Sequence, residues 1–168
     1  MGHTHTVGER TPSNDILNVV EQMDGLMALG ETLVKSGMLP KSIRTREAAV
    51  AIILKGRELG IGVLEAFSSL HIINGRPTIS PQLMMALADR SGQLDDCQVA
   101  DDGHTCSVTV KRKGRTDYTA TFSMDDAQNM GLLNRPNWKA MPQVMRQWRA
   151  MSAAFRQTFA DILTGLYT

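Results

Sequence analysis

The sequence predicts an α+β fold in which β-hairpins form a small antiparallel sheet packed against helices. Asn74-Gly75, a pair favoured in two-residue hairpin turns, lies between apolar segments and predicts one hairpin over about 70–79. Apolar and polar residues alternate on both sides of a glycine-containing turn, which predicts a second hairpin over 106–122. Other segments carry apolar residues at helical spacing. With 168 residues, we expect a disordered polar tail over 1–13 and a single domain over 14–168.

The N-terminal half is predicted to be mainly helical. A first helix runs from about residue 14 to Lys35, although Gly25 and Gly30 interrupt it and are compatible with a division into two. A second helix, 46–59, begins after Thr45, a plausible N-cap, and is followed by a short helical turn over 63–68.

The first hairpin has a register that agrees with its apolar pattern. A two-residue turn places Leu70 opposite Ile79 and Ile72 opposite Pro77, so these residues share one face. Ser80-Pro81 then predicts the start of a helix that runs to about Arg90.

An acidic stretch separates the two hairpins and is predicted to be a loop with solvated charges. A divalent cation such as Mg²⁺ would accept these oxygens, but the spacing matches no EF-hand loop and nothing in the sequence requires a cofactor. The acidic residues are Asp89, Asp95, Asp96, Asp101 and Asp102.

The second hairpin is predicted to turn through a three-residue loop, Arg112-Lys113-Gly114. That loop places Val108 opposite Tyr118 and Cys106 opposite Ala120, and it gives Gly114 a left-handed conformation. A short helix capped by Ser123 follows, and the segment 132–141 is predicted to be a loop.

Positive charge is concentrated in the C-terminal part of the chain. The net charge is only +1, but residues 103–160 hold nine Lys or Arg against three acids, and the remainder is acidic. This asymmetry permits a polyanion site, and also head-to-tail association of identical subunits. Two cysteines without metal-ligand spacing, no leader and no apolar run near 18 residues predict a reduced, cytoplasmic protein outside the membrane.

The helix that begins at Pro142 is predicted to have one core face and one basic face. At about 100° per residue, one arc is expected to pack into the core and the opposite arc to present guanidinium groups that have no acid between 127 and 160. A solvated basic face is the alternative. The core arc holds Val144, Trp148, Met151, Phe155, Phe159 and Ile162, and the basic arc holds Arg146, Arg149 and Arg156.

The hairpin tip and the segment before the basic helix complete a candidate nucleic-acid site. Crowded cations at the tip repel one another, which favours a phosphate contact over a role in folding. Trp138 is compatible with stacking on an unpaired base and equally with covering a core edge. Besides the three helix arginines, the candidates are Lys111, Arg112, Lys113, Arg115, Arg135, Trp138 and Lys139.

Sequence signatures of catalysis are missing. There is no Walker loop, and 60–62 lacks the third glycine and preceding strand of a dinucleotide fingerprint. His71 and His104 lie in no metalloprotease, hydrolase or deaminase pattern. We therefore predict a protein that is not an enzyme.

Several extended phrases resemble the RecT/Redβ-type phage recombinases, a family of single-strand annealing proteins. The similarity spans roughly residues 40 to 168. The phrases are IILKGRELGIG at 52–62, Glu65-Ala66, IINGRPTIS at 72–80, VTVKRKGR at 108–115, FSMDDA at 122–127, NWK at 137–139 and FADILTGLYT at 159–168.

The resemblance implies ATP-independent binding and annealing of single-stranded DNA in homologous recombination. It implies a homo-oligomeric ring or helical filament, with a phage exonuclease and a host single-strand-binding protein as partners, and a small antiparallel sheet backed by helices. The C-terminal tail of the family is not found here. A duplex-binding regulator and a scaffold protein that does not bind DNA are the alternatives.

Overall fold

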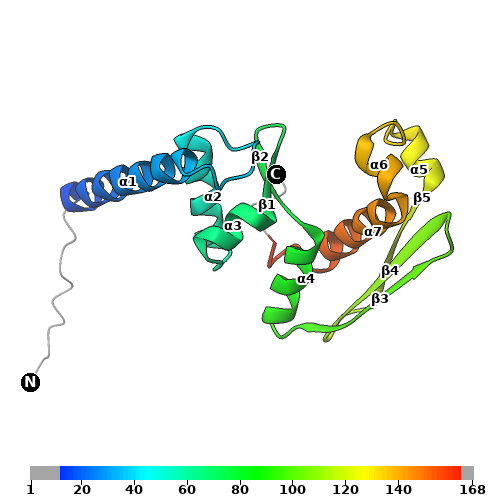
Figure 1. The fold of residues 1–168 in the computed structure, drawn as a ribbon. Helices are drawn as coiled ribbons and strands as arrows, with labels where there is room; N and C mark the ends of the chain where they lie inside the picture. Colours follow the sequence, from blue (N-terminus) through cyan, green and yellow to red (C-terminus); the bar gives the residue numbers. More distant parts are fainter. Residues whose placement is uncertain (1–11, 164–168) are drawn as a thin grey trace, which may run out of the picture. The chain divides into compact units, whose positions relative to one another are not determined.

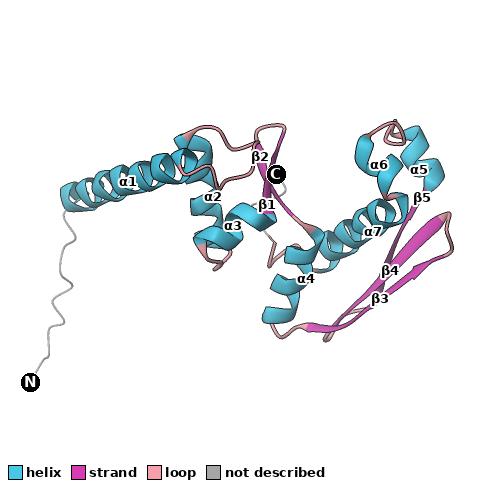
Figure 2. Ribbon diagram, in the orientation of Figure 1, coloured by secondary structure: helices cyan, strands magenta, loops and turns pink. Residues whose placement is uncertain are grey.

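The computed structural model describes residues 12–163, and the chain divides into two compact units, 1–67 and 68–168 (Figure 1). The fold is α+β, as predicted, but it contains two small antiparallel sheets where one was expected (Figure 2). A single domain was expected over 14–168, whereas the chain separates after Phe67, so each unit is described by itself. Most of the expected tail, 1–13, lies outside the described residues.

The first unit is helical, with α1 (Pro12–Lys35), α2 (Arg46–Glu58) and most of α3 (Val63–Ser69). The Thr45 hydroxyl caps α2 by accepting a hydrogen bond from the Ala48 N–H at 3.2 Å, as predicted. The glycines of α1 do not divide it. Gly30 instead allows close approach of α2, because a Cβ there would lie 2.9 Å from the Arg46 carbonyl oxygen.

The second unit begins with a hairpin whose register is confirmed. Strand β1 (Leu70–Ile73) pairs with β2 (Arg76–Ile79), with Leu70 opposite Ile79 and Ile72 opposite Pro77. Asn74 and Gly75 have φ values of 52° and 75°, as the two-residue turn requires. Ser80 then caps α4 (Pro81–Arg90).

The second sheet has three strands in the order β3 (Leu94–Asp101), β4 (Thr105–Arg112) and β5 (Tyr118–Ser123). The prediction of a loop through the acidic stretch is therefore wrong for β3. Its backbone pairs with β4 while its acidic side chains stay at or near the surface, so the charges obscured the strand in the sequence. The two hairpins belong to separate sheets.

The predicted pairing of the second hairpin is wrong by two residues, although the faces are right. Val108 lies opposite Ala120 and Cys106 opposite Phe122, and residues 113–117 connect the strands. A shift of two keeps every side chain on its expected face, so the apolar positions of β4 are still buried. Gly114 has the predicted left-handed conformation, with φ of 74°.

Helix α7 (Pro142–Thr158) organises the second unit. It packs against β4 and β5 and also contacts α4, as Figure 1 shows. Two short helices precede it, α5 (Met124–Asn129) and α6 (Pro136–Ala140), the latter in a segment predicted to be a loop. In the described part of the chain, no helix is long and apolar enough to cross a membrane.

Candidate nucleic-acid interface

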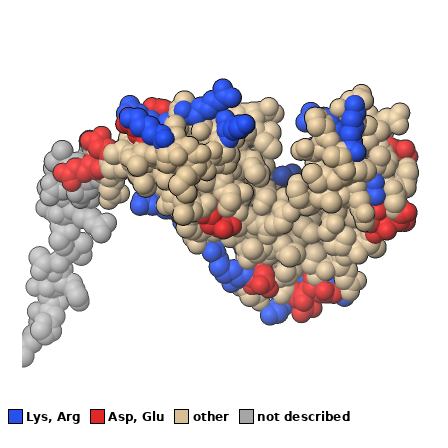
Figure 3. All heavy atoms as spheres, viewed as in Figure 1, with Lys and Arg blue, Asp and Glu red and all other residues tan. Residues whose placement is uncertain are grey.

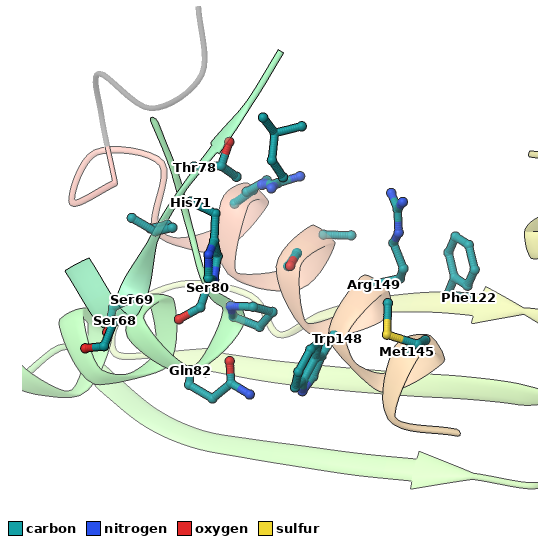
Figure 4. A pocket seen from close by; sticks show the side chains of 16 residues that line it. Ser68, Ser69, His71, Thr78, Ser80, Gln82, Phe122, Met145, Trp148 and Arg149 are labelled. Atoms are coloured by element: carbon teal, nitrogen blue, oxygen red, sulfur yellow. The ribbon is translucent and has the colours of Figure 1, made fainter. Parts of the chain in front are cut away.

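A groove of about 830 Å³ runs along α7 on the side facing the β1–β2 hairpin, within the second unit (Figure 4). Trp148 and Arg149 project into it from α7, while His71 and Thr78 lie across it on the hairpin. In the space-filling view the surface is hollowed between this hairpin and α6, with basic atoms at the bottom of the hollow (Figure 3).

The lining of the groove carries positive charge and no carboxylate. Arg149 and Arg156 are its two permanent cations, and no Asp or Glu is among the residues that line it. The other polar groups are hydrogen-bonding side chains that carry no permanent charge. They are Ser68, Ser69, His71, Thr78, Ser80, Gln82 and Ser152. Such a surface complements an anion and supplies donors for its oxygens.

Arg149 connects this groove to a smaller pocket of about 350 Å³ at α6. Its guanidinium carbon lies 5.9 Å from the centroid of the Phe122 ring, and Arg135 lines the smaller pocket with it. Arg149 is exposed, but the part of its guanidinium that neighbouring atoms shield from water lowers its pKa, and the positive charges of Arg135 and Arg156 lower it further. These three arginines therefore form one basic track, which we call the groove arginines.

Arg146 is not part of this track, and the expectation that it presents an unneutralised guanidinium is wrong. Its side chain is 4% exposed and makes a two-pronged ion pair with Asp101, with N–O distances of 2.8 and 3.2 Å. The partner lies 45 residues earlier on β3, so the absence of nearby acids in the sequence did not reveal it. The pair joins α7 to the sheet.

The expectation that Arg112 contacts phosphate at the hairpin tip is also wrong, because its side chain is only 5% exposed. It donates to both carboxylate oxygens of Asp161, at 2.6 and 2.7 Å, and to the Thr158 carbonyl at 2.8 Å. Its guanidinium carbon lies 4.9 Å from the Phe159 ring centroid. Arg112 therefore ties β4 to the end of α7 and does not offer its charge to a phosphate.

The remaining cations of the hairpin tip do not line the groove. Lys111 lies 3.9 Å from both Asp96 and Asp117, and the Lys113 ammonium donates to the Gly92 carbonyl at 2.9 Å. Arg115 is exposed, and its charge contributes to lowering the pKa of Asp161. Contact of Lys111, Lys113 and Arg115 with DNA stays a prediction, but the expected shared channel with Arg146 and Arg112 is not formed.

Trp138 covers the edge of a hydrophobic core and does not offer its ring for stacking on a base. It is 3% exposed and packs with Ala127 and Leu132, and its ring lies 5.8 Å from that of Phe122. The stacking alternative for Trp138 is therefore wrong, because the ring is already enclosed. Lys139, one residue further on α6, is exposed, and its contact with DNA stays a prediction.

The buried face of α7 is rotated relative to the predicted core face, although Met151 and Phe155 are buried as predicted. The buried side of α7 includes two alanines that allow close packing, and the predicted core residue Trp148 instead lines the groove. The buried positions are Arg146, Ala150, Met151, Ala154, Phe155 and Thr158. Sequence reasoning thus missed Trp148, His71 and the groove hydroxyls. The signal for Trp148 was its position beside Arg149, whereas the hairpin residues become neighbours of α7 only through the fold.

A metal site is not indicated among residues 12–163, where no three His, Cys, Asp or Glu side chains are grouped to hold an ion. The sequence matches no protein-family model, and it has no match among curated proteins. The functional interpretation therefore depends on the groove itself.

Proposed function

We propose that this protein binds single-stranded DNA along the groove of α7 and anneals complementary strands without nucleotide hydrolysis, as a homo-oligomer. The observation that supports this most directly is an acid-free groove in which the groove arginines stand beside two aromatic side chains, Trp148 and Phe122. A single strand alternates phosphates with planar bases, and proteins that bind it combine a basic groove with aromatic rings.

Phosphate contact would supply most of the affinity. An annealing protein has to bind many sequences, and backbone contacts carry no sequence information, whereas base-edge contacts do. Arg149 and Arg156 are seven residues apart on α7, which is about 10 Å along the helix axis. That separation allows the two guanidinium groups to engage different phosphates of one strand.

A salt titration of oligonucleotide affinity tests the proposal. Three phosphate contacts to a single strand predict a slope of about −2 in log K against log salt concentration. The double variant Arg149→Ala, Arg156→Ala should bind more weakly and show a slope nearer zero. Arg44→Ala, which removes an exposed arginine of the first unit, is the matched control and should leave the slope unchanged.

Two outcomes would overturn the proposal. Binding with a slope near zero in the native protein would show that phosphate contacts do not supply the affinity, and the absence of measurable binding would support a scaffold protein that does not bind DNA. Stronger binding of a duplex than of the corresponding single strand would instead support a duplex-binding regulator.

A further inference from the structure

Trp148 is the feature of the groove that phosphate binding leaves unexplained. Its side chain is only partly buried and lines the groove, although an indole gains most by full burial. Within the described residues it pairs with no other aromatic ring and lies under no guanidinium, whereas Phe122 has both kinds of contact. The fold therefore leaves a large aromatic surface beside the basic track.

The neighbours of Trp148 suit a planar, partly polar ligand. In Figure 4 the ring lies between Gln82 at the start of α4 and Met145 of α7, and Arg149, the next residue of the helix, lines the same groove. Gln82 supplies an amide able to donate and accept, and Met145 a soft apolar contact. A nucleobase has a π-face and polar edges, so it matches both kinds of neighbour.

We infer that Trp148 is a stacking platform for one unpaired base of the strand whose phosphates contact Arg149 and Arg156. The inference rests on the proposed function and adds the chemical group that the groove selects. Stacking on an aromatic side chain requires a base whose face is accessible, and a base inside a duplex has both faces covered. Trp148 would thus favour single strands over duplexes, while the arginines bind either.

A comparison of two oligonucleotides with equal numbers of phosphates separates stacking from charge. One is a thymidine oligomer and the other an abasic strand of the same length. The native protein should bind the thymidine oligomer more tightly. Trp148→Ala should weaken that binding about fivefold to 150-fold, the range for loss of one base–aromatic stack, and leave affinity for the abasic strand unchanged.

Fluorescence gives a second readout, because the chain has only two tryptophans. In a Trp138→Phe background, which keeps an aromatic ring in the enclosed site, all tryptophan emission comes from Trp148. The thymidine oligomer should quench it strongly and the abasic strand only weakly. Tyr118→Ala removes an exposed aromatic side chain outside the groove and serves as the matched control, with both affinities unchanged.

Several results would overturn the inference. Equal affinity of the native protein for both strands, or an equal effect of Trp148→Ala on both, would show that the ring contacts no base while leaving phosphate binding intact. Displacement of the thymidine oligomer by polyglutamate at equal charge concentration would indicate an anionic peptide as the ligand. Failure of both strands to bind would overturn the proposed function together with this inference.

Discussion

The ion pair between Arg146 and Asp101 lies almost wholly inside the second unit, with side chains 4% and 9% exposed. Removing one partner leaves a buried charge without compensation, which typically costs about 3–5 kcal/mol. We therefore expect Arg146→Ala to lower the free energy of unfolding by roughly this amount, measured by urea denaturation. A variant as stable as the native protein would contradict the structural role assigned to Arg146.

The same pair has a control that keeps the site neutral. Combining Arg146→Met with Asp101→Asn removes both charges, and we expect it to be more stable than Arg146→Ala because no unpaired carboxylate remains. Arg149→Ala provides the second comparison. Its side chain is exposed, so we expect a change in unfolding free energy within about 0.5 kcal/mol.

The ion pair between Asp161 and Arg112 predicts how the stability of the folded protein depends on pH. Hydrogen bonds from Arg112 hold the pKa of Asp161 at about 2, below its ordinary value of 3.8. Because the folded-state pKa is depressed, the pair stabilises the folded protein above a pH of about 4, and this contribution is lost as the pH falls toward 2.

Replacing Arg112 with Met should return the pKa of Asp161 toward its ordinary value, because the guanidinium that stabilises the carboxylate is gone. NMR titration of the Asp161 carboxyl group in both proteins measures this change. Titration of Asp161 near 4 in the native protein would show that the ion pair does not form in solution.

At the scale of elements, two glycines in the helical first unit have opposite roles. A Cβ on Gly56 of α2 would lie 2.6 Å from the Ala66 Cβ of α3, whereas one on Gly25 of α1 would meet no atom within 4 Å. We expect Gly56→Ala to destabilise the first unit by about 1–3 kcal/mol through overpacking. We expect Gly25→Ala to stabilise it by up to about 1 kcal/mol, since alanine favours helix.

Circular dichroism during thermal unfolding measures both variants. A Gly56→Ala protein that melts with or above the native protein would show that α3 does not pack on α2 as described. The Gly25→Ala protein is the matched control, because it makes the same chemical change in a helix of the same unit.

The elements that the sequence predicted well are those determined by local chemistry. The Asn74-Gly75 turn and the Thr45 and Ser80 caps each depend on a few neighbouring residues, and all three are found. Strand β3 was missed because its evidence is non-local: the backbone of an acidic segment becomes a strand only when β4 is available to pair with it.

The candidate site was only partly predictable for the same reason. Arg149 and Arg156 could be found from a helical wheel, since the nearby sequence has no acid. The burial of Arg146 and Arg112 depends on Asp101 and Asp161, which are 45 and 49 residues away in the chain. Local charge counts cannot contain that information, so the basic segments appeared more exposed than they are.

At the scale of the whole molecule, positive charge available to a ligand is less than the sequence suggests and more narrowly placed. Two of the ten residues first considered, Arg112 and Arg146, are used to attach α7 to the sheet, and Trp138 is used to pack α5 and α6. The groove arginines line the groove and the adjoining pocket as a compact track.

The placement of the groove arginines predicts which amides a bound DNA strand protects from hydrogen exchange. With a saturating thymidine oligomer, we expect the largest slowing of amide exchange in the segments that form the groove and the adjoining pocket: β1, β2, α6 and the hydrogen-bonded amides of α7. Binding of the oligonucleotide reduces local unfolding of these elements, because the oligonucleotide binds only their folded form. The Arg149→Ala, Arg156→Ala variant, measured at the same oligonucleotide concentration, should lose this protection. Protection that is largest at residues 113–117 and persists in that variant would instead make the hairpin tip the main DNA contact, since its cations lie outside the groove.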